Sequence, residues 1–404
     1  MPIRISPDTL RQIATEYGTP VYVYHAERIK EQYENLLTAF SETRPRIFYA
    51  CKALTNINIL KYINRLGCNI DCSSINEVKL ALKAGFEPGR ILYTSNSIDI
   101  SEIEEAKSLG IYINIDSLSN LEKFARNNGS AYPVGLRLKP NILAGGNLKI
   151  STGHARSKFG IPLEDIDEVL RIQKETGLII QGLQIHTGSE IKDVEVFAKG
   201  MEILFEVAMK FSNLRYIDLG GGFKVPYAPG EEGTNLQKLA ARVADAFHAF
   251  EKQYGRRLEL WFEPGKYLVS EAGYFITRVN VLKQSGSICF AGINSGLNHL
   301  IRPMFYGSYH EIENISNPDG PLQAYTVVGN ICETDTFAED RMLPALREGD
   351  LLVFLNAGAY GFEMASNYNA RFKPAEILLM DGKSHLIRQR DTLDDLLSKQ
   401  IEVL

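Results

Sequence analysis

Eight short β-rich runs recur between residues 46 and 266, and a stretch with helical periodicity follows most of them. The early runs are spaced by roughly 22 residues, which leaves room for one helix and two short loops. The intervening stretches, such as SINEVKLALKAG and ISEIEEAKSLG, carry apolar residues at helical spacing and end in glycine. The runs are Arg46–Tyr49, Asn69–Cys72, Arg90–Tyr93, Ile111–Ile115, Val134–Leu138, Ile179–Ile185, Tyr216–Leu219 and Leu258–Phe262.

This alternation predicts an α/β protein with a parallel sheet that closes into a (β/α)₈, TIM-like barrel. An open, doubly wound sheet is the alternative. A longer insertion around residues 140–178 follows the fifth run and contains TGHARSKFGIP, which we interpret as an active-site loop.

After about residue 270 the pattern changes to strand-like segments separated by Gly, Asn and Pro turns, such as GYFITRVNVLKQ, LQAYTVVG and DLLVFLNAGAY. We therefore predict a C-terminal antiparallel β domain, of sandwich or barrel-like form. The expected division is a barrel over residues 26–270 and a β domain over 271–404 that includes residues 1–25. The strand VYVYH at 21–25 could join either unit.

Composition excludes several classes of protein. The 404 residues are 45% hydrophobic and 23% charged, as in a globular protein large enough for two domains. A net charge of −5 without a run of Lys or Arg argues against nucleic acid and membrane surfaces as partners. The first residues lack the apolar core of a signal peptide, so we expect a cytoplasmic location. Five cysteines without a CxxC pair indicate neither a disulfide framework nor a metal site.

Four of the predicted strands end in polar or glycine-rich sequences. The first runs into Lys52, the sixth into HTGS at 186–189, the seventh into GGG at 220–222 and the eighth into EPG at 263–265. Taken singly, each could be a solvated lysine, a core histidine, a tight turn or a helix cap. In a barrel, however, the carboxyl ends of the strands meet at one mouth, so the four features are expected to act together.

These residue types suit one cofactor. A lysine can form a Schiff base with an aldehyde, and glycine N–H groups can cradle a phosphate. A carboxylate that faces a pyridine nitrogen keeps it protonated, so that the ring accepts electrons, and a histidine can stack on the ring face. The set predicts pyridoxal 5'-phosphate.

Longer motifs extend this interpretation over nearly the whole chain. They are FYACKA at Lys52, SKFGIP at 157–162, QIHTGSE at His186, LGGGF at 219–223, FEPGK at 262–266, GLNHLIRPMFYGSYH at 296–310, NICETDTF at Cys332 and AGAYGFEMASNYNARFKPAEIL at 357–378. In this ordered set the chain resembles the alanine-racemase-like (fold-type III) pyridoxal-phosphate enzymes, and among them the diaminopimelate decarboxylases. The resemblance implies decarboxylation of meso-2,6-diaminopimelate to L-lysine, the last step of lysine biosynthesis.

The resemblance also implies roles for individual residues. Lys52 would hold the cofactor covalently, Glu263 would pair with its ring nitrogen, and His186 would stack on the ring. Further cofactor contacts are implied for Ser189, Gly221, Gly222, Gly265, Lys266 and Tyr360. Substrate contacts are implied for Lys266, Arg302, Tyr306, Glu333 and Tyr360. Cys332 would donate a proton across the interface of a homodimer.

Two departures from the family pattern keep alternatives open. Lys266 stands where the family usually has arginine, which removes a planar, bidentate donor. The segment after Glu333 reads Thr-Asp-Thr instead of the more common Ser-Gly/Ser-Asp. A sister decarboxylase for another diamino acid, a carboxylated polyamine or a siderophore intermediate is therefore the main alternative. A racemase would need a second base that the sequence does not announce. An inactive homologue would have lost Lys52, Glu263 or Cys332, and all three are retained.

Overall fold

The computed structural model describes residues 4–141 and 157–404, which form two compact units. The barrel unit comprises Gln32–Val225 and Glu232–Leu268. The β unit comprises the chain up to Glu31, Pro226–Glu231 and Val269–Leu404. Much of the insertion interpreted as an active-site loop, residues 142–156, lies outside the described residues.

The predicted TIM-like barrel is confirmed. Eight parallel strands pair in the order β5-β4-β3-β2-β10-β9-β8-β6, and a β5–β6 pairing closes the ring. A short extra strand, β7 (Ile161–Pro162), adds to β6. The barrel strands are β2 (Arg46–Ala50), β3 (Asn69–Cys72), β4 (Ile91–Thr94), β5 (Tyr112–Ile115), β6 (Val134–Lys139), β8 (Ile180–Ile185), β9 (Tyr216–Asp218) and β10 (Glu259–Phe262).

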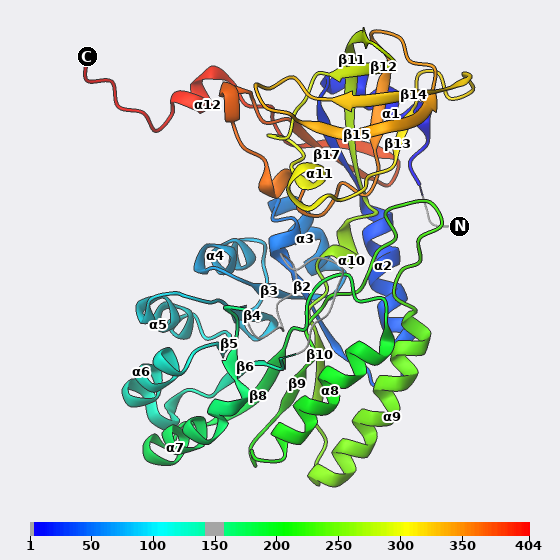
Figure 1. Ribbon diagram of the computed structural model, residues 1–404. Coiled ribbons are helices and arrows are strands. Elements are labelled where there is room, and N and C mark those ends of the chain that lie inside the picture. The colour runs from blue at the N-terminus through cyan, green and yellow to red at the C-terminus, as the bar shows by residue number, and fades with distance from the viewer. Residues whose placement is uncertain (1–3, 142–156) are drawn as a thin grey trace. The chain divides into compact units, whose positions relative to one another are not determined.

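Amphipathic helices cover the outside of the barrel strands (Figure 1). In α4, for example, the Ser74 side chain accepts a hydrogen bond from the Glu77 N–H and starts the helix, while Ile75, Val78 and Ala81 are buried. The helices are α2 (Ala26–Ala39), α3 (Ile57–Arg65), α4 (Ile75–Lys83), α5 (Ile100–Ser108), α6 (Leu118–Asn128), α7 (Ile166–Thr176), α8 (Val194–Ala208) and α9 (Leu236–Tyr254). A single helical turn, α10 (Lys266–Val269), follows β10.

Aromatic side chains fill the barrel around Trp261 of β10. The Trp261 and Tyr216 rings are stacked with their centroids 3.6 Å apart, and both side chains are almost fully buried. The Arg46 guanidinium, at the start of β2, lies 5.1 Å from the ring centroids of both Trp261 and Phe48. The amino-terminal end of the barrel is therefore a packed core, and room for chemistry remains at the carboxyl ends of the strands.

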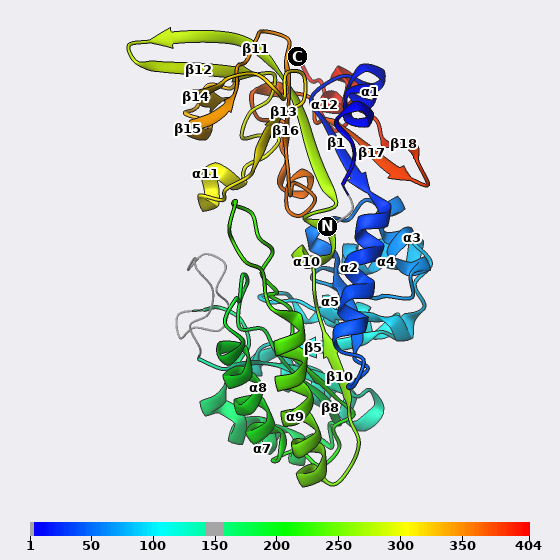
Figure 2. The same ribbon diagram turned by 90° about the vertical axis from the view of Figure 1, so that its right-hand side faces the viewer.

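The β unit contains one nine-stranded sheet in the order β15-β14-β12-β11-β1-β17-β18, with β16 joining β11 to β13. Figure 2 shows β11 and β12 running together as a long hairpin. The strands are β1 (Val21–His25), β11 (Gly273–Ser285), β12 (Ile288–Ile293), β13 (Ile312–Asn314), β14 (Leu322–Val328), β15 (Thr336–Pro344), β16 (Leu351–Phe354), β17 (Ala375–Met380) and β18 (Lys383–Arg388). Short helices are α1 (Pro7–Tyr17), α11 (Arg302–Tyr306) and α12 (Leu393–Leu397).

The predicted antiparallel β domain is confirmed as a mostly antiparallel sheet that also contains two parallel pairings. Most pairings are antiparallel, but β1 runs parallel to β17, and β12 runs parallel to β14. The strand VYVYH that could join either unit is β1, and it lies between β11 and β17 with all five residues buried. Because β1 lies far from both neighbours in sequence, local patterns could not reveal the direction of its pairing.

The core of the β unit forms where α1 packs on the sheet. Ile13 of α1 is buried with Val21 of β1, Ile276 of β11, Val353 of β16 and Ile377 of β17. Within the described ranges of both units, every helix is too short or too polar to cross a membrane.

Candidate active site

The polar strand ends of the barrel unit lie together at its carboxyl-terminal mouth. Lys52 is in the 3₁₀ turn η1 (Cys51–Ala53) directly after β2. The Glu263 N–H donates to the Gly220 carbonyl at 2.8 Å, and the Ala50 N–H donates to the Pro264 carbonyl at 3.1 Å. The Gly221 N–H donates to His186 Nδ1 at 3.2 Å. These hydrogen bonds thus join the ends of β2, β8, β9 and β10.

Lys52 faces a buried carboxyl group that the sequence analysis did not select. Its Nζ lies 3.7 Å from Oδ2 of Asp71, which is the second-last residue of β3 and is 3% exposed. Burial raises the pKa of Asp71 well above its usual value, the charge of Glu263 adds to the rise, and Lys52 opposes it. The pair places an acidic group beside the amine that would form the covalent bond.

Glu263 is a buried acid with an unused acceptor. Gln184 donates to its Oε2 at 3.0 Å, whereas Oε1 has no hydrogen-bond partner among the described residues. Burial raises the pKa of Glu263 well above its usual value, and the charge of Asp218 contributes to the rise. A buried carboxylate needs a cation or a donor beside it. A positively charged N–H group beside Glu263 would therefore stabilise its carboxylate.

His186 is neutral in this mouth. Burial lowers its pKa well below its usual value, and the positive charges of Arg137 and Lys52 lower it further. Its Nδ1 accepts the Gly221 N–H, so the proton of the neutral ring is on Nε2. The hydrogen bond to the glycine turn also fixes the orientation of the ring.

The turn after β9 requires glycine for steric reasons. A side chain at Gly221 would place Cβ 2.3 Å from the Glu263 carbonyl oxygen. Gly222 has φ of +97°, and a Cβ there would lie 2.3 Å from the Gly188 carbonyl oxygen. The Ile191 N–H donates to the Gly222 carbonyl at 2.9 Å and links this turn to the loop that carries Ser189. The resulting turn presents backbone without side chains, as a phosphate cradle requires.

Lys266 and Glu190 form an ion pair next to this turn. Lys266 Nζ lies 2.7 Å from Glu190 Oε1, and the lysine side chain is 8% exposed. Glu190 has φ of +64°, in the left-handed region. Gly265, before Lys266, lies so close to β2 that a Cβ would be 3.0 Å from the Ala50 carbonyl oxygen. A cation and a carboxylate therefore border the glycine turn together.

In the β unit, Arg302 lies among three tyrosine rings. Its guanidinium carbon is 5.2 Å from the ring centroid of Tyr227, 5.8 Å from that of Tyr306 and 6.0 Å from that of Tyr360. Tyr360 has φ of +57°. Arg302 is 3% exposed, and its NH2 donates to Ser308 Oγ at 3.3 Å. In the described part of the chain no Asp or Glu pairs with it, and its Nε lacks a hydrogen-bond partner. A buried guanidinium in this state is suited to an external carboxylate.

Cys332 and Glu333 belong to an exposed cluster in the β unit. Cys332 is the exposed cysteine among the five, while Cys51, Cys68 and Cys72 are buried. Asn369 and Tyr368 contact it, and the Tyr368 hydroxyl donates to Glu333 Oε1 at 2.8 Å. The thiol that the sequence distinguished from the others is thus surrounded by polar groups.

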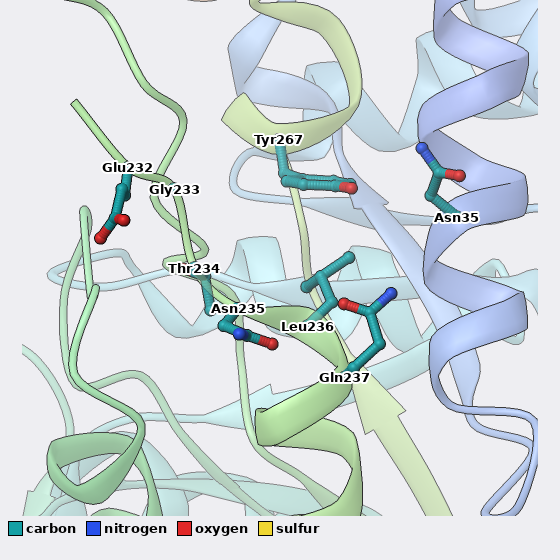
Figure 3. A pocket seen from close by; sticks show the side chains of 8 residues that line it. All are labelled: Asn35, Glu232, Gly233, Thr234, Asn235, Leu236, Gln237 and Tyr267. Atoms are coloured by element: carbon teal, nitrogen blue, oxygen red, sulfur yellow. The ribbon is translucent and has the colours of Figure 1, made fainter. Parts of the chain in front are cut away.

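A separate hollow of about 550 Å³ lies at the amino end of α9 (Figure 3). Asn235 starts this helix by accepting a hydrogen bond from the Lys238 N–H. The hollow is lined by Asn35, Glu232, Gly233, Thr234, Asn235, Leu236, Gln237 and Tyr267. It contains none of the predicted site residues.

Several polar residues beside the predicted site residues of each unit were not predicted from the sequence. They are Asp71, Arg137, Gln184, Glu190 and Asp218 in the barrel unit, and Tyr227, Tyr368 and Asn369 in the β unit. For four of them, the position within a predicted strand could have indicated a place in the site. Asp71, Arg137, Gln184 and Asp218 are polar residues near the carboxyl ends of otherwise apolar barrel strands.

Comparison with known families agrees with this architecture. Residues 26–270 match the model of the pyridoxal-dependent decarboxylases, for their pyridoxal binding domain. That stretch contains Lys52, His186, the glycine turn and Glu263. The chain therefore belongs to the pyridoxal-dependent decarboxylase family, among the relatives of the diaminopimelate decarboxylases.

Individual relatives cover almost the full length. The diaminopimelate decarboxylase of Methanothermobacter thermautotrophicus is 40% identical, over 96% of this chain and 93% of the relative. The crystal structure of diaminopimelate decarboxylase from Helicobacter pylori complexed with L-lysine is 33% identical, with a TM-score of 0.88 over 96% of this chain and 98% of that chain. The enzyme from M. jannaschii in co-complex with L-lysine is 30% identical, with a TM-score of 0.89 over 97% and 94%.

Proposed function

We propose that this chain uses pyridoxal 5'-phosphate to convert meso-2,6-diaminopimelate to L-lysine and carbon dioxide, the last step of lysine biosynthesis. The observation that carries the proposal is the buried Glu263 with an unused acceptor oxygen, at the same mouth as Lys52 and the glycine turn. The choice of substrate rests on near full-length relatives that are diaminopimelate decarboxylases.

The barrel residues fit the cofactor. Its pyridine N–H would supply the donor and the positive charge that Glu263 needs, and the Lys52 amine would bind its aldehyde. The neutral His186 ring would stack on the cofactor ring. The phosphate contacts proposed are Ser189, Gly221, Gly222, Gly265, Lys266 and Tyr360.

When bound, the cofactor supplies an electron sink for the electrons that remain when the Cα–carboxylate bond breaks. The residues of this chain provide orientation and charge. Glu263 would keep the ring nitrogen protonated, because a buried carboxylate without a cation is costly. Asp71, 3.7 Å from Lys52, would hold a proton for the lysine amine or return it.

Substrate recognition would follow charge complementarity. Arg302 would bind the distal carboxylate, since it is buried without an acidic partner in the described chain. Tyr306 and Tyr360 would add hydroxyl contacts, and Lys266 a second positive charge. Glu333 would bind the distal ammonium group.

We also propose that Cys332 protonates the carbon that has lost its carboxylate, and that it does so in the active site of a partner subunit in a homodimer. Its exposure on the single chain supports this arrangement, because a partner must reach it. Five cysteines without a disulfide support a reducing, cytoplasmic location.

One observation favours a second candidate, a decarboxylase for a different diamino acid or carboxylated polyamine. Lys266 is already paired with Glu190, so less of its positive charge is available to a substrate carboxylate. A substrate with one carboxylate fewer at its distal end would suit such a site.

The experiment is to add meso-diaminopimelate to the purified protein with pyridoxal phosphate and to measure carbon dioxide and lysine. Parallel reactions with lysine, ornithine and carboxynorspermidine discriminate between the two candidates. The matched control is Lys52→Ala, which should lose the visible absorption band of the bound cofactor and all turnover. A protein that stays colourless in excess pyridoxal phosphate would contradict the proposal.

A further inference from the structure

Asn369 contacts Cys332 at two atoms. Its Oδ1 accepts from the Cys332 N–H at 2.8 Å, and its Nδ2 donates to the Cys332 Sγ at 3.0 Å. Asn369 has φ of +57° and Ala370 has φ of +54°. Asparagine tolerates this left-handed conformation, but alanine rarely adopts it. The backbone of this segment is thus held in a strained conformation that brings one amide to both the backbone and the thiol of Cys332.

Tyr368 connects the same thiol to Glu333. Its hydroxyl oxygen lies 3.6 Å from Cys332 Sγ and donates to Glu333 Oε1 at 2.8 Å. The hydroxyl has one hydrogen, so it can serve one acceptor at a time. While the thiol is protonated, its S–H can point to the Tyr368 oxygen. When the thiol has lost its proton, the Tyr368 O–H can turn to the sulfur.

These donors favour the anionic form of the sulfur. A hydrogen bond from Tyr368, followed by one from Asn369, lowers the pKa of Cys332, whereas the charge of Glu333 opposes the shift. The same contacts raise the pKa of Tyr368. An N–H donor 3.0 Å from the sulfur is present whichever way the tyrosine hydroxyl points.

We propose that Asn369 and Tyr368 are positioning residues for Cys332, which orient its S–H group and stabilise the sulfur anion that remains after proton transfer. This assignment rests on the proposed function for the identity of the proton acceptor. In the transfer the S–H bond breaks, a C–H bond forms at the carbon that lost its carboxylate, and the electron pair stays on sulfur. The sulfur then recovers a proton from water.

The same segment contains a matched control. The Asn367 Nδ2 donates to the Arg371 carbonyl and to Asp391 Oδ2, each at 2.9 Å. Asn367 therefore supports the loop through its side-chain amide. Within the described residues this amide bonds to Arg371 and Asp391 and not to Cys332. A purely structural role for asparagines in this loop predicts equal effects at both positions.

The test is the pH dependence of Cys332 alkylation by iodoacetamide in the full-length protein with cofactor, followed by peptide mass spectrometry. In Asn369→Asp the side chain keeps its shape and its Oδ1 acceptor but loses the N–H donor. We expect the midpoint of the profile to move to higher pH, and the rate at neutral pH to fall about threefold to tenfold. Tyr368→Phe should shift the midpoint in the same direction, and Asn367→Ala should match the unmodified chain.

An unchanged midpoint in Asn369→Asp would overturn the proposal, and so would an equal shift in Asn367→Ala. If the larger change Asn369→Ala disturbs folding, the isosteric variant Asn369→Asp still tests the proposal. The alkylation result does not depend on turnover. A protein without decarboxylase activity would refute the proposed function, while a decarboxylase whose Asn369→Asp variant keeps the original midpoint would refute only the role of Asn369.

Discussion

Lys266 and Glu190 are paired at the edge of the glycine turn, with 2.7 Å between Nζ and Oε1. The side chains are 8% and 27% exposed, so the pair is largely shielded from solvent. The family resemblance places arginine at position 266, and this chain combines a lysine there with a local counter-ion. Glu190 therefore limits the positive charge that Lys266 can offer to a phosphate or a carboxylate.

Replacing Glu190 with Gln should strengthen phosphate binding. Without the carboxylate, Lys266 has more charge to share with the cofactor, so the Kd for pyridoxal phosphate should fall about threefold to tenfold. Absorbance titration of the cofactor-free protein measures this Kd. Glu232→Gln is the control, because Glu232 forms an exposed ion pair with Lys192 at 2.9 Å. An equal or weaker affinity in Glu190→Gln would show that the pair does not restrain Lys266.

Asp218 makes the stability of the cofactor-free protein depend on pH. Burial raises the pKa of Asp218 from 3.8 to about 7. Between these two values the folded chain keeps a proton that the unfolded chain releases, so the free energy of unfolding falls as the pH rises. Asp218→Asn removes this penalty, and its oxygen can still accept the Gly220 N–H. We expect stabilisation by about 1–3 kcal/mol at neutral pH.

Denaturant unfolding of both proteins at several pH values measures the effect of Asp218→Asn. The gain should shrink towards zero as the pH is lowered to the acidic end of this window. Asp167→Asn serves as the control, because the Asp167 side chain is 89% exposed. A gain in Asp218→Asn that stays constant with pH would argue against titration of Asp218.

Replacing Cys332 with Ala should separate turnover from cofactor binding. Loss of a proton donor costs about 100-fold or more in kcat, while the residues proposed to hold the cofactor do not include Cys332. Steady-state kinetics and the visible absorption band provide the two measurements. Cys289→Ala, at a partly exposed thiol, is the matched control. Turnover close to normal in Cys332→Ala would remove the thiol from the mechanism.

Glu333→Ala tests recognition of the distal ammonium group. We expect KM for meso-diaminopimelate to rise about tenfold, because a charge-assisted contact is lost. The rise in KM should be small for 2-aminopimelate, which lacks the distal amine. Steady-state kinetics with both substrates gives the ratio of the two increases in KM. Equal increases in KM would mean that Glu333 does not distinguish that amine.

The barrel could be predicted because its strands and helices alternate with clear periods. All eight strands were located to within one or two residues, from Arg46 in β2 to Phe262 in β10. The mixed sheet of the β unit could not be predicted, since the parallel pairing of Val21 with Ala375 joins distant segments. The inclusion of Pro226–Glu231 in the β unit likewise has no local signature.

The sequence directed attention to residues at conspicuous motifs and not to isolated polar residues. Lys52 and Glu263 stand after strand ends within recognisable motifs, whereas Asp71 and Asp218 lie inside short strands, where only their position near the carboxyl end distinguishes them. Their importance comes from burial and from the charges around them, which exist only after the barrel has closed. The role of Asn369 depends on its backbone conformation and could not be read from the sequence.

The stacking of Trp261 of β10 on Tyr216 of β9 has a practical consequence. Trp261 is the only tryptophan of the chain and precedes Glu263 by two residues. Its emission overlaps the absorption of a pyridoxal chromophore, so energy transfer should quench it as the mouth fills. Fluorescence of the unlabelled protein can therefore report cofactor loading in real time, from a ring that belongs to the framework and takes no part in the chemistry.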